Sequence, residues 1–425
     1  MLEKIIQIWR IKDLRNSILF VALMLVIFRI AAHIPIPGVD TNGLKELFAN
    51  NQLLGLINIF SGGSMDKLSI VMLGVAPYIT SSIIFQLLTM VVPSLEELSK
   101  DGESGRKKIN QWTRLASIPL AALQAFSMIT LLRQSSGYVM LNLDAWQWVM
   151  AITTVTAGTV FLMWLGELMT EKKIGNGISL LIFAGIVSGL PGLILRTLTT
   201  LDKTQIINMA VFAVIALVTI AAIVFITEGQ RNVPVSYARN VRGGRALGSG
   251  NSFLPIRVNQ AGVIPIIFAV SIIIFPQAIA RLFANAHTPW VKDTAAWVLH
   301  TLSNQGVYGV FYFLLVVLFT YFYTAVIFHP DRVSENMQKN GGFIPGIRPG
   351  THTAHYLQSV VNRVTLAGAL FLGIVAVLPL ITAQITHTQA LVVGGTSLLI
   401  VVSVVIESIK QINSQLEMRD YDQIV

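Results

Sequence analysis

The sequence predicts an all-α polytopic membrane protein, and three observations lead to that prediction. Of its 425 residues, 54% are hydrophobic and only 12% are charged, whereas soluble domains carry about a quarter charged residues. Apolar runs of about twenty residues, long enough to cross ~30 Å of hydrocarbon, recur along the chain. Lysine and arginine gather in alternate connecting segments, which is typical of a chain that crosses a membrane repeatedly.

Ten apolar runs are predicted as membrane spans. They cover roughly residues 17–34, 71–92, 112–132, 146–169, 178–195, 205–227, 261–281, 306–328, 357–381 and 389–408. An even number of spans puts both termini on one side. Of the 30 Lys and Arg residues, 22 fall on that side and 7 on the other, with Arg29 inside the first span. Both termini are therefore expected in the cytoplasm.

The spans divide into two groups of five at the connection 196–204, which we interpret as a hinge loop. Because five is odd, the halves 1–195 and 205–409 enter the membrane in opposite directions. Inverted halves of this kind usually place the working site at their interface. Residues 410–425 are predicted to form a cytoplasmic tail.

The segment between the first two spans is irregular. Two prolines in HIPIPGVD end the first span, and the apolar run 53–60 is too short to cross a membrane. Gly62, Gly63 and Asp66 follow directly. Non-helical backbone survives at membrane depth only when it is buried in protein or lines a wet cavity. Two interpretations remain open: a surface loop with a short amphipathic helix, or a re-entrant segment that enters the bundle.

Enzymatic and cofactor chemistry find little support in the composition. The absence of cysteine excludes disulfides, thiolate catalysis and cysteine-based metal sites. We find no catalytic motif, and no metal or cofactor is expected. A secondary solute transporter is the fairer alternative, but coupled transporters usually need ionisable groups at mid-membrane. Arg29, Glu167 and Glu407 instead stand near span ends, where snorkelling or local pairing explains them.

The polar residues within the spans are mostly neutral. The second span reads GVAPYITSSIIFQLLTM, with Thr80, Ser81, Ser82 and Gln86 among isoleucines. Ordinary hydrogen bonding between helices, worth ~0.6 kcal/mol per contact, is the simplest explanation for them. Isoleucines also stand four residues apart at the start of the second and fifth spans. Composition does not tell whether these side chains meet.

The motifs of the chain closely resemble those of the SecY family, the pore-forming subunits of bacterial Sec translocons. The resemblance runs from about residue 4 to 415 and rests on IPIPGVD, FSGGSM, LGVAPYITSSIIFQLL, DGESGRKKINQWTR, MWLGELMTEKKIGNGISLLIFAGIVSGLP, VNQAGVIPIIFA, GGFIPGIRPG and GGTSLLIVVSVV. It implies ten helices in two five-helix halves closed like a clamshell, and a protein-conducting channel rather than an enzyme. That channel passes unfolded preproteins across the bacterial plasma (inner) membrane and releases hydrophobic segments sideways into lipid.

The resemblance also implies three sites within the membrane. A pore ring falls on Ile79, Ile83, Ile178, Ile182, Ile267 and Ile400. A re-entrant plug helix at about 57–70 includes Asn58, Phe60, Ser61, Gly62, Gly63 and Met65. A lateral gate between the second and seventh spans carries Thr80, Gln86, Asn259 and Phe275. An aliphatic ring suits its role because a narrow apolar constriction sheds water.

The two long cytoplasmic loops, 228–260 and 329–356, resemble the family's docking loops. Their candidate docking residues are Arg231, Arg239, Arg242, Arg245 and Arg348. Arg348 is the only charge in GGFIPGIRPG, and Pro345 and Pro349 restrict the backbone on both sides of it. A charge that only sets topology needs no such stiffness. The partners implied are the SecA ATPase, the ribosome, the SecE and SecG subunits, the signal peptide of the preprotein, and membrane lipid.

Overall fold

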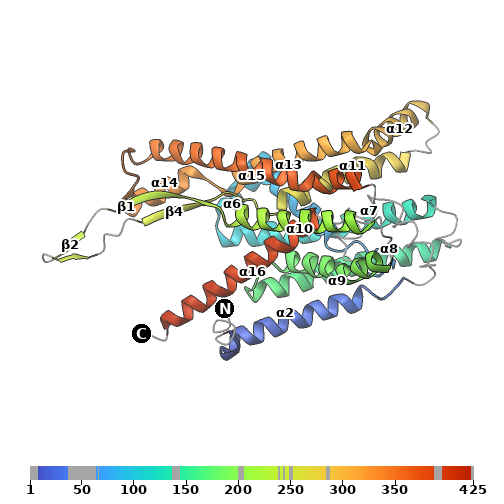
Figure 1. Cartoon of the computed structure of the whole chain (residues 1–425), viewed down its shortest axis with the longest axis horizontal. Helices are drawn as coiled ribbons and strands as arrows, with labels where there is room; N and C mark the ends of the chain where they lie inside the picture. The colour runs from blue at the N-terminus through green and yellow to red at the C-terminus, as the bar shows by residue number, and fades with distance from the viewer. Residues whose placement is uncertain are drawn as a thin grey trace.

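The molecule is a bundle of long helices with a β-ribbon projecting from one end (Figure 1). The computed structural model describes residues 8–36, 64–65, 67–135, 144–199, 205–237, 240–242, 245–247, 252–283, 288–386 and 395–422. The helices are α2 (Lys12–Ala31), α5 (Ala76–Val91), α6 (Pro93–Lys100), α7 (Glu103–Ser135), α8 (Ala145–Glu171), α9 (Gly177–Thr199), α10 (Gln205–Glu228), α11 (Ile264–Phe283), α12 (Pro289–Ser303), α13 (Gln305–Ile327), α14 (Pro330–Lys339), α15 (Thr351–Thr386) and α16 (Gly395–Asp422).

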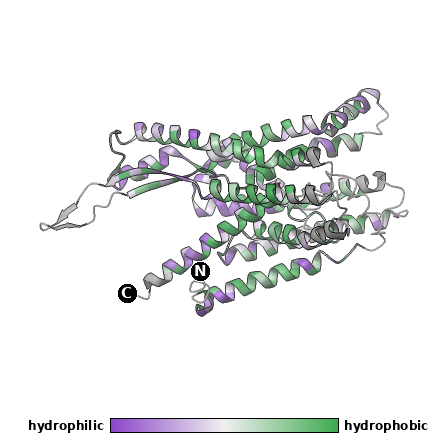
Figure 2. Ribbon diagram, in the orientation of Figure 1, coloured by the Kyte–Doolittle hydropathy of each residue, from purple (hydrophilic) through white to green (hydrophobic). Residues whose placement is uncertain are grey.

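Each predicted span overlaps one long helix of this set. By length and composition, five helical stretches in the described residues are able to cross a membrane, or six if α5 and α6 count as one broken span. The break between them bends by 101° and falls at Pro93, where the proline ring disfavours a continued helix. Hydrophobic residues line the body of the bundle, and hydrophilic residues gather at the ribbon end (Figure 2).

Exposed apolar faces on the outer helices indicate contact with lipid. Along α2, Leu19, Leu23, Val26 and Ile30 are each about half exposed or more. Phe225 of α10 is 78% exposed. In water such exposed apolar faces would promote aggregation, but in a bilayer they are the expected lipid-facing surface of a span.

The described part of the irregular segment, from Ser64 to Val75, is buried inside the protein. Ser64, Leu68 and Met72 are fully buried, and the backbone forms turns rather than a helix. Its amides find partners, because Ile36 N–H donates to the Leu68 carbonyl (2.9 Å) and Ile70 N–H to the Ile34 carbonyl (3.0 Å). These residues therefore enter the bundle and do not form a surface loop.

A small sheet joins the two long loops, and the sequence did not lead us to expect it. β1 (Gln230–Tyr237) pairs antiparallel with β4 (Ser252–Arg257), and its far end pairs with β5 (Gly342–Phe343). Two further strands, β2 (Asn240–Arg242) and β3 (Arg245–Leu247), form a hairpin beyond them. The alternation of buried Val233 and Val235 in β1 was the available signal, and Pro234 between them obscured it.

The connection between the predicted spans 261–281 and 306–328 contains α12. This helix begins at Pro289, a favoured residue for a first helical turn, and packs against α11 and α13.

We expect Gly158→Ala to destabilise the protein. A Cβ at Gly158 would stand 2.0 Å from the carbonyl oxygen of Ile70, so α8 and the buried segment would have to separate. Overpacking of this kind costs ~1–3 kcal/mol. The matched control is Gly189→Ala in α9, where a Cβ would meet nothing within 4 Å. Thermal unfolding in detergent measures both; equal midpoints for the two variants would contradict the proposed close contact.

Candidate functional site

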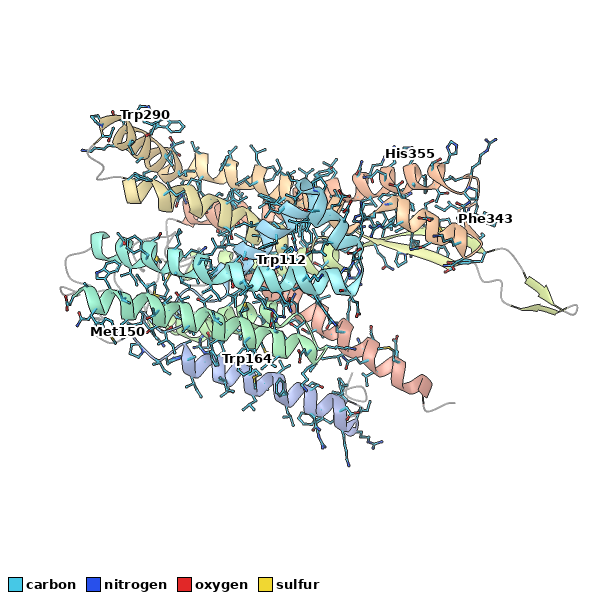
Figure 3. All side chains as sticks on the ribbon, turned by 180° about the vertical axis from the view of Figure 1, so that it is seen from behind. Trp112, Met150, Trp164, Trp290, Phe343 and His355 are labelled. Atoms are coloured by element: carbon cyan, nitrogen blue, oxygen red, sulfur yellow. The ribbon has the colours of Figure 1, made fainter. Side chains whose placement is uncertain are left out.

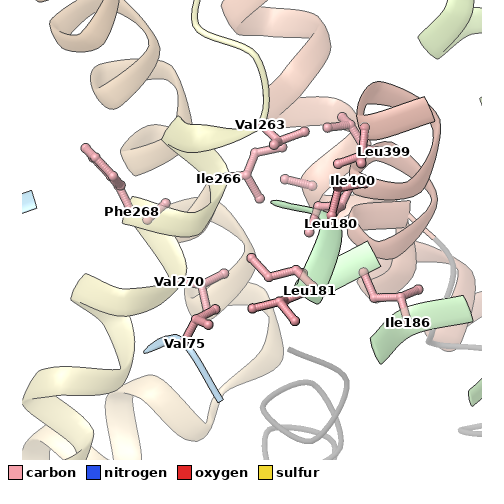
Figure 4. Packing of buried hydrophobic residues seen from close by; sticks show 14 of the residues in the cluster. Val75, Leu180, Leu181, Ile186, Val263, Ile266, Phe268, Val270, Leu399 and Ile400 are labelled. Carbon is pink, nitrogen blue, oxygen red and sulfur yellow. The ribbon is translucent and has the colours of Figure 1, made fainter. Parts of the chain in front are cut away.

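The candidate site lies within an extended apolar cluster, to which α5, α9, α11 and α16 contribute together with α2, α8, α10, α13 and α15. The six isoleucines predicted as a ring all belong to it. Ile83, Ile182 and Ile400 are buried, with 4%, 4% and 0% exposure, and Ile79, Ile178 and Ile267 pack against the same cluster. In Figure 4, Ile400 and Leu399 of α16 lie close to Leu180 of α9 and to Val263 and Ile266 at the start of α11. The structure thus brings together residues spread over more than three hundred positions of the chain.

Side chains that were not singled out from the sequence complete this cluster. Leu181 and Leu399 are almost fully buried in it, and Ile266 is fully buried. Each lies directly before a predicted ring residue in the sequence. The helical spacing of apolar residues was the only signal by which the sequence could have indicated them. Aliphatic side chains offer no hydrogen bonds to water or ions, and a narrow space lined by them dewets. The cluster is chemically suited to seal a pore.

The turn between α8 and α9 sets the position of Ile178. A Cβ at Gly177 would stand 1.9 Å from the Gly166 carbonyl oxygen, so only glycine allows this approach of the two helices. The Thr170 hydroxyl donates to that carbonyl (2.8 Å) and accepts from Gly177 N–H (2.9 Å). The Asn176 side chain accepts from Ile178 N–H (3.0 Å). These bonds hold the start of α9 against α8.

Of the predicted gate residues, Thr80 and Gln86 lie on α5, Phe275 lies on α11, and Asn259 lies in the segment between β4 and α11. The helices α5 and α11 are in contact. The Thr80 hydroxyl donates to the carbonyl of Ala76 in its own helix (3.0 Å). Gln86 Oε1 and Asn259 Oδ1 are buried and have no hydrogen-bond partner among the described residues. Burying such an oxygen without a hydrogen bond typically lowers the stability of the closed structure by ~1–3 kcal/mol. For Phe275 the structure describes the backbone, in α11, and not the side chain.

Two other polar residues have ordinary partners. The Ser81 hydroxyl donates to the Thr113 carbonyl of α7 (2.7 Å), which is hydrogen bonding between helices. Glu167 forms an ion pair with Arg114, which is local pairing near a span end. Among the described residues, no group of three His, Cys, Asp or Glu side chains is placed to hold a metal ion.

Of the predicted plug, only Met65 can be placed. It is 2% exposed and packs with Leu68, Met72 and Val155 in a second apolar cluster. Asn58, Phe60, Ser61, Gly62 and Gly63 lie outside the described residues. The predicted plug helix is therefore not seen in the described part of 57–70, which forms turns.

Arg348 lies exposed on a turn with a well-defined backbone. Its carbonyl accepts from the Thr353 hydroxyl (2.9 Å), and Gly346 and Gly350 adopt left-handed φ values of +82° and +92°. Among the described residues, no carboxylate forms an ion pair with Arg348. Its guanidinium is free to meet a partner.

The two candidate docking loops form one surface, which we call the docking platform: β1, β4, β5 and the turn 344–350. Tyr237 of the first loop pairs with Gly342 of the second, and Phe343 and His355 mark this end in Figure 3. Arg231 is exposed on β1. Arg242 and Arg245 stand on the hairpin strands, whose side chains are not described, and Arg239 lies outside the described residues. In neighbouring α14, a hydrogen bond from Lys339 lowers the pKa of Glu335.

Comparison with known proteins identifies the family. The family model described as SecY matches residues 69–409. The "Protein translocase subunit SecY" of Streptomyces galbus is 41% identical, and that of Halalkalibacterium halodurans 42%, each over 99% of both chains.

The chain belongs to the SecY family.

Solved structures show the same fold. "The structure of a protein conducting channel" aligns with a TM-score of 0.64 at 18% identity, covering 93% of this chain and 91% of that one. "Sec61 in the Canine ribosome-channel complex from the endoplasmic reticulum" aligns with a TM-score of 0.61 at 16% identity, with the same coverage. As a SecY family member, the chain is a membrane-embedded subunit of a protein-conducting channel, and the solute-transporter alternative is not favoured.

We expect Ile400→Asn to increase the ion conductance of the resting channel, because an amide stabilises water inside a narrow apolar cluster. Ile83→Asn should act in the same direction. The matched control is Ile409→Asn, at a 52% exposed position of the same helix, which should leave conductance unchanged. Conductance is measured on channels reconstituted in planar bilayers. Unaltered conductance in both cluster variants would argue against a sealing role.

Proposed function

We propose that this chain is the pore-forming subunit of a bacterial Sec translocon and that the isoleucine cluster is its pore ring. The observation that carries the proposal is that six isoleucines from four helices, two helices from each predicted half, lie in or against one buried apolar cluster. A ring of flexible aliphatic side chains seals against ions when closed. It also deforms around an extended polypeptide without selecting a sequence, as a channel for many preproteins requires.

The proposal includes ten spans in two inverted halves, with both termini on the cytoplasmic side of the inner membrane. Three features support this arrangement. The predicted spans overlap the long helices one by one. α2 begins and α16 ends toward the end of the bundle from which the ribbon projects (Figure 1). The excess of positive charge assigns that end to the cytoplasm.

The segment at 57–70 would act as the plug and the α5–α11 seam as the lateral gate. The burial of Met65 and its neighbours supports a re-entrant path for the plug. The unpaired oxygens of Gln86 and Asn259 support a seam that parts readily. Water or a passing chain would satisfy them once the helices separate, which offsets part of the cost of opening. Signal peptides and hydrophobic segments would leave through this seam into lipid.

The docking platform would receive the SecA ATPase and the ribosome in turn, while SecE and SecG complete the complex. Its arginines suit both the carboxylates of a protein partner and the phosphates of ribosomal RNA. The structural neighbour in a ribosome–channel complex agrees with this assignment for Sec61. Energy would come from SecA or from the translating ribosome, since the channel itself performs no chemistry.

We expect a tight crosslink between cysteines at positions 80 and 275 to block both secretion and membrane insertion, because both require α5 and α11 to part. The native chain lacks cysteine, so no other thiol competes. A long flexible crosslinker should restore part of the function. Each single-cysteine variant, oxidised in the same way, is the control. Insertion that continues through the tight crosslink would place the exit elsewhere.

We expect Arg348→Glu to abolish SecA-driven translocation and leave the channel folded. Breaking a desolvated charge pair costs ~2–5 kcal/mol, and reversal adds repulsion. Arg348→Lys should also impair SecA-driven translocation, because lysine cannot form the planar bidentate contact of a guanidinium group. The measurement is SecA ATPase stimulation by preprotein in proteoliposomes, together with resting conductance, which should stay unchanged. Arg106→Glu, at an exposed position of α7 outside both docking loops, is the matched control. Normal SecA ATPase stimulation by the Arg348→Glu channel would show that Arg348 contributes only to membrane topology and not to SecA docking.

A further inference from the structure

The base of the β-ribbon is held firmly against the helical bundle. Val258 N–H donates to the Gly229 carbonyl (2.9 Å) and closes the ribbon where it leaves the helices. A Cβ on Gly368 of α15 would stand 2.5 Å from the Val258 carbonyl oxygen, so backbone lies against backbone at this point. A displacement of the ribbon is therefore passed to the bundle and not absorbed by a loose hinge.

Charged groups at this base face α16. Glu228, the last residue of α10, forms an ion pair with Lys410 of α16 (2.8 Å). Arg257, the last residue of β4, lies within electrostatic range of Glu407 of the same helix. Residues 407 and 410 are three apart and share one face of a helix. The two ends of the ribbon thus each meet an opposite charge on one face of α16.

The same helix contributes to the pore ring. Ile400 precedes Glu407 by seven residues, about two helical turns or ~10 Å. It is fully buried in the isoleucine cluster. Because the residues between them are continuously helical, a movement at Lys410 shifts Ile400 as part of the same rigid element.

Beyond Lys410, α16 also contacts the other half of the molecule. Gln415 Nε2 donates to the carbonyl of Lys173 (2.6 Å), in the turn between α8 and α9. A Cβ on Gly175 of that turn would stand 3.0 Å from Ser408 Oγ. This turn holds the start of α9, where Ile178 joins the ring cluster. α16 therefore contacts the ribbon base, the ring and the turn that positions α9.

We propose that α16 transmits movement of the docking platform to the pore ring, and that Glu228 and Lys410 are the positioning pair for this transmission. The proposal rests on the docking role proposed above. A partner that pulls or pushes the ribbon moves α16 through this pair, supported by the electrostatic attraction between Arg257 and Glu407. The helix then displaces Ile400 directly and α9 through the 172–176 turn.

The test is a charge exchange in the SecA-driven complex in proteoliposomes. Glu228→Lys and Lys410→Glu, each made singly, place like charges together and should lower the maximal translocation rate about three- to tenfold. The SecA concentration for half-maximal rate should not change, because the docking surface is intact. The double exchange, Glu228→Lys with Lys410→Glu, restores the pair and should recover most of the rate. Lys410→Gln removes the pair without repulsion and should give a smaller loss.

A matched control separates transmission from a general effect of charge reversal. Single reversals of the exposed pair Glu96–Lys100 (2.6 Å) in α6 should leave the rate unchanged. Unaltered rates in both Glu228→Lys and Lys410→Glu would overturn the proposal, as would a loss that the double exchange does not recover. Failure of the docking role itself has a different signature: Arg348→Glu would leave the half-maximal SecA concentration unchanged.

Discussion

A backbone amide or carbonyl in hydrocarbon costs several kcal/mol when it lacks a hydrogen bond, and the structure depends on that constraint. Helices satisfy it along the spans. The turns from Ser64 to Val75 satisfy it only because they are enclosed by α2, α7 and α8 and bonded to residues 34–36. Gly158 makes this enclosure possible, since any side chain there would collide with the Ile70 carbonyl. Irregular chain is thus held inside the bundle, packed among buried apolar side chains of α7 and α8.

The same constraint explains where the molecule is weakly held. Within the spans, most hydroxyls turn back to carbonyls of their own helix, as Thr80 does to Ala76. Gln86 and Asn259 each have a buried oxygen without a partner among the described residues, as do the hydroxyls of Tyr312, Ser403 and Ser408. Under the proposed gate, the oxygens of Gln86 and Asn259 gain hydrogen bonds when α5 and α11 part and water enters.

At the ribbon end of the bundle, which we propose is cytoplasmic, electrostatics replaces apolar packing. The arginine-bearing platform lies at this hydrophilic end, where charged side chains are solvated. Its base is anchored by backbone contact at Gly368 and by ion pairing to α16. Under the proposed transmission, this rigid anchoring lets the movement of a partner reach the isoleucine cluster through mechanical contacts.

The sequence by itself determined the helical membrane class and the family, because hydropathy and long motifs are local properties of the chain. From hydropathy and charge asymmetry it also predicted the span positions and the topology, which stay predictions. It also identified the six isoleucines, although their spacing did not show that they meet. Only the tertiary structure decided that Ile83, Ile182 and Ile400 pack in one cluster and that β5 joins the two docking loops through Tyr237 and Gly342. It alone placed Lys410 beside Glu228. These are contacts between residues far apart in sequence, and they depend on how helices pack and strands pair, which no local pattern encodes.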